Sequence, residues 1–212
     1  MASASIKLTT IAVSLAVILA TEGLAWWFVG RSLFSPLAVV GLVRLFQIAM
    51  LCWVAVKWEG GLRAIGWSPA SWGAGLKKGA QWSAGFGAAA AVAMLVVYMS
   101  GHNPLRLIKS PLPSTALEMG LFFFVGGLIA PVAEELCFRG MLYTFFRRWG
   151  MVTALVASTA IFAGLHALHG IPVTQIVGGI VFAIAYETSG NLMVPITIHC
   201  LGNLAIFTLS LL

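Results

Sequence analysis

The chain has 212 residues, of which 60% are hydrophobic and only 8% are charged, and its mean hydropathy is +1.00. A soluble domain carries about 25% charged residues, so this composition excludes an ordinary soluble protein and predicts an all-α polytopic membrane protein. The net charge of +6 does not indicate a nucleic-acid partner, because the sequence has no basic patch with interleaved aromatic residues.

About seven apolar passes are expected, separated by loops rich in Gly, Pro and charged residues. The segment 57–78 mixes cations with Trp and Gly, so we expect it to lie on the membrane rather than cross it. The third pass is crowded with small residues, which let helix backbones approach closely. The passes are expected at 8–29, 34–56, about 79–99, about 115–148, about 151–168, 172–188 and 191–211, with a second loop at 100–114.

The segment 115–148 is too long for one ordinary pass, since a helix rises about 1.5 Å per residue and the hydrocarbon core is about 30 Å thick. Pro131 is expected to kink or break it, with an entering half at 115–130. A broken helix is tolerated within a membrane where it lines a cavity. We therefore distinguish two parts of a single membrane domain, the N-terminal helices 1–114 and a helical core 115–212.

The loop cations predict the topology, because cytoplasmic loops carry an excess of Lys and Arg. One side holds Lys7, Lys57, Arg63, Lys77, Lys78, Arg147 and Arg148. The other side holds Arg31, Arg106 and Lys109. This asymmetry predicts a cytoplasmic amino terminus, and an odd number of passes would put the carboxyl terminus outside. The small size and brief loops favour the plasma membrane of a prokaryote, with lipid as a partner, and they indicate no oligomeric state.

Two sets of residues are expected to be structural. Arg44 lies inside the second pass, where pairing with Glu22 on the neighbouring pass would neutralise it. Cys52, Cys137 and Cys200 fall in apolar stretches without CxxC or His-Cys ligand spacing, so we interpret them as buried small side chains.

The stretch Pro131–Gly140 places three ionisable residues, Glu134, Glu135 and Arg139, in a sequence that is otherwise almost entirely apolar. Glu135 and Arg139 are four residues apart and can form an ion pair on one helix face, whereas Glu134 is rotated about 100° from Glu135. Glu134 therefore has no partner in its own helix and is available as a general base. The structural alternative is a single network of all three residues between helices.

Two further patterns lie on later passes. Phe162 and His166 are one helical turn apart, and His199 and Asn203 repeat that spacing. Each pattern alone is more typical of a hydrogen bond between helices than of catalysis. The combination is more specific, because an unpaired Glu, two His and an Asn occupy three different passes of one small protein.

Together, Pro131-x-x-Glu134-Glu135-x-x-Phe138-Arg139-Gly140, Phe162-x-x-x-His166 and His199-x-x-x-Asn203 resemble the three-motif signature of the CPBP family, the CAAX proteases and bacteriocin-processing enzymes also called the ABI family. The similar region runs from about 131 to 203, and the run Gly190–Ile196 also resembles the segment before the last motif.

The resemblance implies an intramembrane endopeptidase in which Glu134 and His166 activate a water molecule, and His199 and Asn203 stabilise the oxyanion. In this reading Glu135, Arg139 and Phe162 are supporting residues, and Leu165, Leu168, Phe138 and Phe162 are candidates for an apolar wall. Family members cleave prenylated tails in eukaryotes and are linked in prokaryotes to bacteriocins, peptide signals and surface-protein sorting. The expected partner is thus a peptide or protein with a membrane-associated tail.

Three alternatives stay open. Glu134, His166 and His199 could form a zinc site with an open position for water, although the HExxH pattern is absent and we expect metal-independent hydrolysis. A transporter would also place Glu, Arg and His at mid-membrane depth, but the sequence shows no internal repeat. A non-catalytic scaffold or immunity protein is disfavoured because no motif position has been lost.

Overall fold

The computed structural model describes residues 6–32, 34–167 and 172–212, and the regular elements in these ranges are all helical. Four helices are long and apolar enough to cross a membrane, and three more are apolar and shorter. This confirms the expected all-α polytopic membrane fold with seven passes. The passes are α1 (Leu8–Gly30), α2 (Pro36–Glu59), α3 (Trp72–Met99), a composite helix (Ala116–Trp149), α7 (Met151–His166), α8 (Val173–Ser189) and α9 (Met193–Leu209).

The composite helix contains three α-helical stretches, α4 (Ala116–Phe124), α5 (Ala130–Glu135) and α6 (Thr144–Phe146). π-Helical segments join them at Val125–Ile129 and Leu136–Tyr143, and a 3-10 turn closes the helix at Arg147–Trp149. Its start is set by Thr115, whose hydroxyl oxygen accepts the backbone N–H of Glu118 and caps the first turn. Its end is set by Gly150, which has a φ of 106°.

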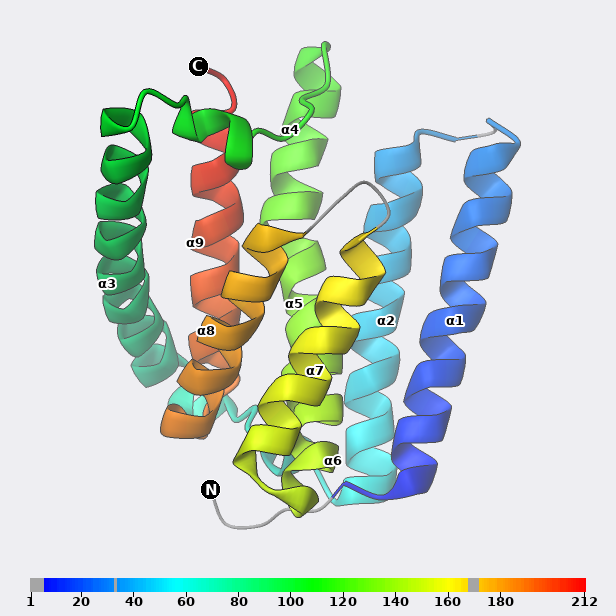
Figure 1. The fold of residues 1–212 in the computed structure, drawn as a ribbon. Coiled ribbons are helices and arrows are strands. Elements are labelled where there is room, and N and C mark those ends of the chain that lie inside the picture. Colours follow the sequence, from blue (N-terminus) through cyan, green and yellow to red (C-terminus); the bar gives the residue numbers. More distant parts are fainter. Residues whose placement is uncertain (1–5, 33, 168–171) are drawn as a thin grey trace.

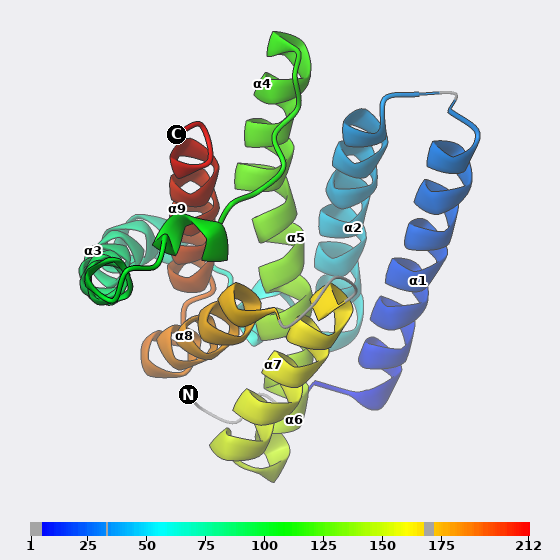
Figure 2. The same cartoon turned by 45° about the horizontal axis from the view of Figure 1, so that its top comes forward.

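The composite helix runs through the middle of the molecule, with α1 and α2 on one side and α3 and α9 on the other (Figure 1). α7 and α8 pack side by side and cover the lower half of the composite helix, as the turned view also shows (Figure 2). α5 packs against α9, and both α7 and α8 contact the π-helical segment that follows it. The three later helices and the centre of the composite helix therefore surround one region of the molecule.

Of the two expected outcomes at Pro131, a kink or a break, the break does not occur, because the chain stays helical through it. The preceding turn widens instead, and the Ala130 N–H reaches the Val125 carbonyl five residues back. Pro131 has no N–H for the next bond of this pattern, to the Gly126 carbonyl. That carbonyl accepts a hydrogen bond from Asn203 Nδ2 on α9 at 2.9 Å. A π-helical turn and a side chain from another helix thus replace the expected break.

The third pass begins earlier than expected, since α3 starts at Trp72 and not near residue 79. Lys77 and Lys78 therefore lie in its first two turns. Cations mark where a chain leaves the hydrocarbon region, but a helix can continue into the interface while its Lys side chains reach water. Of the segment 57–78, the residues from 72 onward belong to α3, and the part before them holds two short 3-10 turns.

Small residues bring α3 and α9 together at one end only. A Cβ atom added at Gly75 would lie 2.6 Å from Met193 Cβ, and one added at Gly79 would lie 2.5 Å from Thr197 Cβ. These two glycines therefore confirm close helix packing on the third pass. Gly85 and Gly87, farther along α3, have no neighbour within 4 Å of such an atom, so the rest of the small-residue run does not serve this contact.

The structural interpretation of Arg44 is confirmed. Its guanidinium pairs with Glu22 on α1, and Gln47 on α2 joins the cluster by accepting from Arg44 at 2.7 Å and donating to Glu22 at 3.0 Å. The three cysteines are free thiols, with Cys137 buried and the other two half-buried.

Candidate active site

Glu135 and Arg139 form the expected ion pair, with Arg139 Nη1 2.9 Å from Glu135 Oε1, and neither side chain is exposed. Arg139 Nη2 also donates to the Gly179 carbonyl on α8 at 3.1 Å. Three aromatic rings surround the guanidinium at 5.0 to 5.9 Å from their centroids, those of Phe138, Phe162 and Phe182. A buried charge is tolerated when it is paired and hydrogen-bonded, and this pair has both kinds of contact together with cation–π contacts, although Glu135 Oε2 and Arg139 Nε have no hydrogen-bond partner among the described residues.

His199 lies between the two glutamates. Its Nδ1 is 2.8 Å from Glu135 Oε1, and its Nε2 is 3.7 Å from Glu134 Oε2. A carboxylate paired with Arg is ionised and can only accept, so Nδ1 of His199 is the donor in the first contact. The second distance is too long for a direct hydrogen bond and is one that a water molecule can bridge. Glu135 thus orients the imidazole, and Nε2 faces Glu134.

Glu134 is the more open of the two glutamates. Its side chain is 20% exposed, whereas that of Glu135 is fully buried. In the described part of the chain its one ion-pair contact is the long one to His199. The carboxylate that the sequence leaves without a partner in its own helix therefore faces an imidazole from another helix.

Aromatic rings fix the plane of the His199 imidazole. The Phe182 ring stacks on it with a centroid separation of 4.7 Å and an interplanar angle of 22°. The Phe162 ring meets it edge-on at 6.1 Å. The imidazole is therefore held by a hydrogen bond at one nitrogen and by rings on its face and at its edge.

His166 stands at the end of α7 and is exposed. Its Nδ1 donates to the Phe162 carbonyl at 2.8 Å, and its ring lies 4.9 Å from the Phe162 ring. Within the residues that the structure describes, His166 makes no hydrogen bond to Glu134 or His199. The Phe162 ring contacts the imidazoles of both His166 and His199. Only Nε2 of His166 is left to act in a reaction.

Asn203 is placed by its bond to the Gly126 carbonyl. One N–H of its amide is engaged there, which leaves the second N–H and the amide oxygen for other partners. The spacing of His199 and Asn203 does not predict this contact, because it contains no information about the Gly126 carbonyl, to which Pro131 cannot donate a hydrogen bond.

The residues expected to form an apolar wall differ in burial. Phe138 and Phe162 are buried and meet edge-to-face with centroids 4.9 Å apart. Leu165 is 65% exposed. Leu168 and the neighbouring His169 lie outside the described residues.

The residues proposed as zinc ligands are not gathered into a metal site. Across residues 6–32, 34–167 and 172–212, no group of three His, Cys, Asp or Glu side chains is arranged to hold a metal ion. Nδ1 of His199 is engaged by Glu135 and Nδ1 of His166 by a carbonyl, and Nε2 of each ring makes no hydrogen bond in this part of the chain. Because the three side chains do not converge on one point, the arrangement does not fit zinc, and we derive no step through a metal.

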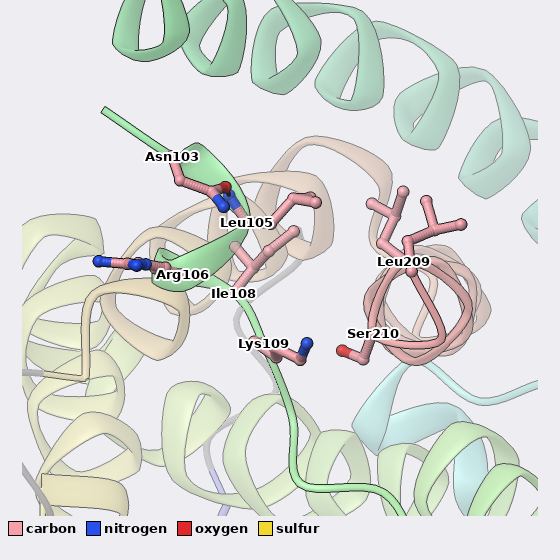
Figure 3. A pocket seen from close by; sticks show the side chains of 8 residues that line it. Asn103, Leu105, Arg106, Ile108, Lys109, Leu209 and Ser210 are labelled. Carbon is pink, nitrogen blue, oxygen red and sulfur yellow. Dashed lines mark hydrogen bonds between the residues drawn. The ribbon is translucent and has the colours of Figure 1, made fainter. Parts of the chain in front are cut away.

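A recess of about 220 Å³ lies elsewhere, between the connection from α3 to α4 and the end of α9. Figure 3 shows Lys109 extending toward Ser210 across this recess, while Arg106 points away from it. None of its lining residues belongs to the three motifs. The recess is therefore separate from the cluster around His199.

A cluster of two Glu, an Arg and a His lies at the centre of a bundle of seven apolar helices, and the fold defines the class of this protein as a polytopic membrane protein. Residues 116–205 match the family model described as type II CAAX prenyl endopeptidase Rce1-like. This segment is an Rce1-like domain, which confirms the resemblance carried by the three motifs and extends it to the start of α4. No curated protein and no solved structure matches the chain.

Sequence reasoning missed two contributions from α8, the Gly179 carbonyl and the Phe182 ring. This helix has no charged residue before Glu187, so a search of the sequence for charged groups does not select Gly179 or Phe182. The one available signal was the spacing of Gly179 and Phe182, three residues apart and hence on one helix face.

Proposed function

We propose that the protein is an intramembrane endopeptidase in which Glu134 acts as the general base. The observation that carries the proposal is the position of Glu134 opposite Nε2 of His199, with Nδ1 of His199 held by Glu135. A neutral imidazole that donates through Nδ1 presents an acceptor at Nε2. A water molecule between Glu134 and His199 would donate one hydrogen to each and turn its lone pairs toward a peptide carbonyl.

Hydrolysis then needs two proton transfers. Glu134 takes a proton from the water as its oxygen forms a bond to the carbonyl carbon, which gives a tetrahedral oxyanion. Glu134 returns the proton to the amide nitrogen as the C–N bond breaks. The products are a carboxylic acid and an amine, and no oxidant or other reactant is consumed.

His166 and Asn203 remain proposed site residues with more restricted roles. His166 can act only through Nε2, as an acceptor when neutral and as a donor when protonated. Asn203 can offer its second N–H to the oxyanion while the first holds the Gly126 carbonyl. A positioned oxyanion donor is worth roughly 3–4 kcal/mol of transition-state stabilisation. The contacts favour His199, rather than His166, as the partner of Glu134 for the water.

The substrate class rests on the setting and on the family. The site lies within a helical membrane bundle, and the family model carries the words CAAX prenyl endopeptidase. We therefore propose a peptide or protein with a membrane-associated carboxyl-terminal tail as substrate. A cytoplasmic amino terminus and location in a prokaryotic plasma membrane remain part of the proposal.

The test is cleavage by the purified protein in liposomes, with a quenched fluorescent peptide that ends in a farnesylated CAAX sequence and the same peptide without the lipid. Glu134→Gln keeps the shape of the side chain and removes the base, so we expect kcat to fall about 10²–10⁴-fold. Glu118→Gln changes a glutamate at the start of α4 and should leave the rate unchanged. Wild-type cleavage by Glu134→Gln would contradict the proposal.

We also propose that the reaction needs no metal, because Glu134, His166 and His199 are not gathered around one point in the described part of the chain. Cleavage should then be unaffected by 1,10-phenanthroline and EDTA. A loss of activity that added zinc restores would overturn this part of the proposal and leave the assignment of the protease intact.

A further inference from the structure

We propose that α8 is the positioning element of the site and that Phe182 is the positioning residue that fixes the His199 imidazole. The inference rests on the proposed function, since it assigns Phe182 a role in keeping Nε2 of His199 directed at Glu134. Neither the three motifs nor the family resemblance assigns a role to this helix.

One face of α8 contacts both polar groups that organise the site. Gly179 offers its carbonyl to the Arg139 guanidinium at 3.1 Å. Phe182, one turn later, places its ring 5.1 Å from the same guanidinium and 4.7 Å from the imidazole of His199. The Phe182 ring therefore contacts both the Arg139 guanidinium and the His199 imidazole, the two groups that bind the Glu135 carboxylate.

Gly179 lets this face approach. A Cβ atom added there would lie 2.8 Å from Thr159 Cγ2 on α7, closer than real Cβ contacts come. A larger residue would require Thr159 or α8 to shift, and a shift of α8 would withdraw both the carbonyl and the Phe182 ring. The close approach of two helices thus sets the position of the ring.

Two constraints are needed to orient an imidazole. The bond from Nδ1 to Glu135 fixes one direction in the ring, and the stacked Phe182 fixes the plane that contains it. With both in place, the direction of Nε2 is determined. Without the ring, the side-chain torsions of His199 can change while Nδ1 stays within reach of Glu135. A displacement of 1 Å at a reacting group can lower the rate about 10²-fold.

The ring also belongs to a small apolar cluster, which permits a purely structural interpretation. Phe182 packs with Ala185, Val194 and Ile198, and it is 7% exposed. A structural role predicts only a loss of stability on substitution. A positioning role predicts in addition a change in the ionisation and ring environment of His199, and this difference separates the two.

The experiment compares Phe182→Leu with Phe145→Leu in the full-length protein. Phe145 is a matched control, because it is 8% exposed and its ring contacts Phe146, Trp149 and the Arg148 guanidinium at the end of the composite helix, none of which is a proposed site residue. Both variants lose one buried ring and keep an apolar side chain. Thermal unfolding in detergent reports the loss of stability in each.

The first readout is kinetic, with the same farnesylated peptide. We expect Phe182→Leu to lower kcat about 10–100-fold with KM within twofold of wild type, and Phe145→Leu to keep both values within twofold. Equal kcat values in the two variants would overturn the inference. A parallel loss of kcat and of folded protein in both would overturn it as well.

The second readout does not depend on cleavage. In ¹⁵N-histidine NMR spectra, with the His199 signals assigned from His199→Gln, Phe182→Leu should shift the ring signals and the titration midpoint of His199, and Phe145→Leu should leave them unchanged. Unchanged His199 signals in Phe182→Leu would overturn the inference even if cleavage is normal. If wild type cleaves no peptide but the signals shift, the positioning stands and the proposed function fails.

Discussion

The two parts of this chain hold acid–base clusters in similar apolar surroundings, and they use them differently. In the N-terminal part, Glu22 accepts from both Arg44 and Gln47, so the cluster is closed on itself. In the core, Arg139 forms an ion pair with Glu135, and Glu135 accepts a hydrogen bond from His199. Among the described residues Glu134 has no Arg partner, and it faces the other nitrogen of the His199 imidazole. The comparison teaches that charge within a membrane does not by itself indicate catalysis. The indicative feature is a carboxylate left over after the ion pairs are formed.

The largest difference is expected on removing the cation from each cluster. Arg139→Met should lower the free energy of unfolding by about 3–5 kcal/mol, because it leaves Glu135 fully buried and uncompensated. Arg44→Met should cost about 1 kcal/mol, since Glu22 is 44% exposed and retains Gln47. Denaturation in mixed detergent micelles measures both. Equal losses would remove the distinction between the clusters.

The next difference is in activity. Glu135→Gln should lower kcat about 10²-fold, because the amide holds Nδ1 of His199 less firmly and in no fixed tautomer. Glu22→Gln should keep kcat within about twofold, since that cluster contacts no proposed site residue. Steady-state cleavage of the farnesylated peptide measures both variants. An equally impaired Glu22→Gln would show that the N-terminal part takes part in the reaction.

The smallest expected effect distinguishes a structural role of Asn203 from a role in the reaction. Asn203→Ala should cost about 1–3 kcal/mol of stability, because the Gly126 carbonyl loses its side-chain donor. Adding Pro131→Ala restores a backbone N–H at the position that faces this carbonyl in the π-helical pattern, and should recover part of that stability. If the double variant regains stability but not cleavage, Asn203 also acts in the reaction. If it regains neither, the proposed replacement of Pro131 by Asn203 is wrong.

Much of the fold could be predicted from the sequence, because hydropathy reports directly on membrane passes. The seven passes, the Glu135–Arg139 pair and the Glu22–Arg44 pair follow from apolar length and from the cost of an unpaired charge. The expectation of a kink or a break at Pro131 did not include a third outcome, a π-helical turn that keeps the chain helical through the proline.

The candidate site was harder to predict, because its geometry depends on helix packing. Helical spacing separates Glu134 from Glu135, but it does not show that His199 fits between them. The contribution of Phe182 could not be predicted, since an aromatic residue in an apolar helix is ordinarily part of the core. Spacing shows which residues share a helix face, whereas contacts between helices are fixed only by tertiary structure.

The most direct test of the account is a double-mutant cycle of Glu135→Gln and His199→Gln, with kcat measured on the farnesylated peptide. Because Glu135 influences the reaction through His199, the folded double variant should be no slower than folded His199→Gln, whereas the loss of the Arg139 pair should appear as reduced stability in both variants that lack Glu135. Losses that multiply in the double variant would show that Glu135 and His199 act independently, and would contradict the arrangement of Glu134, His199 and Glu135 as one catalytic unit.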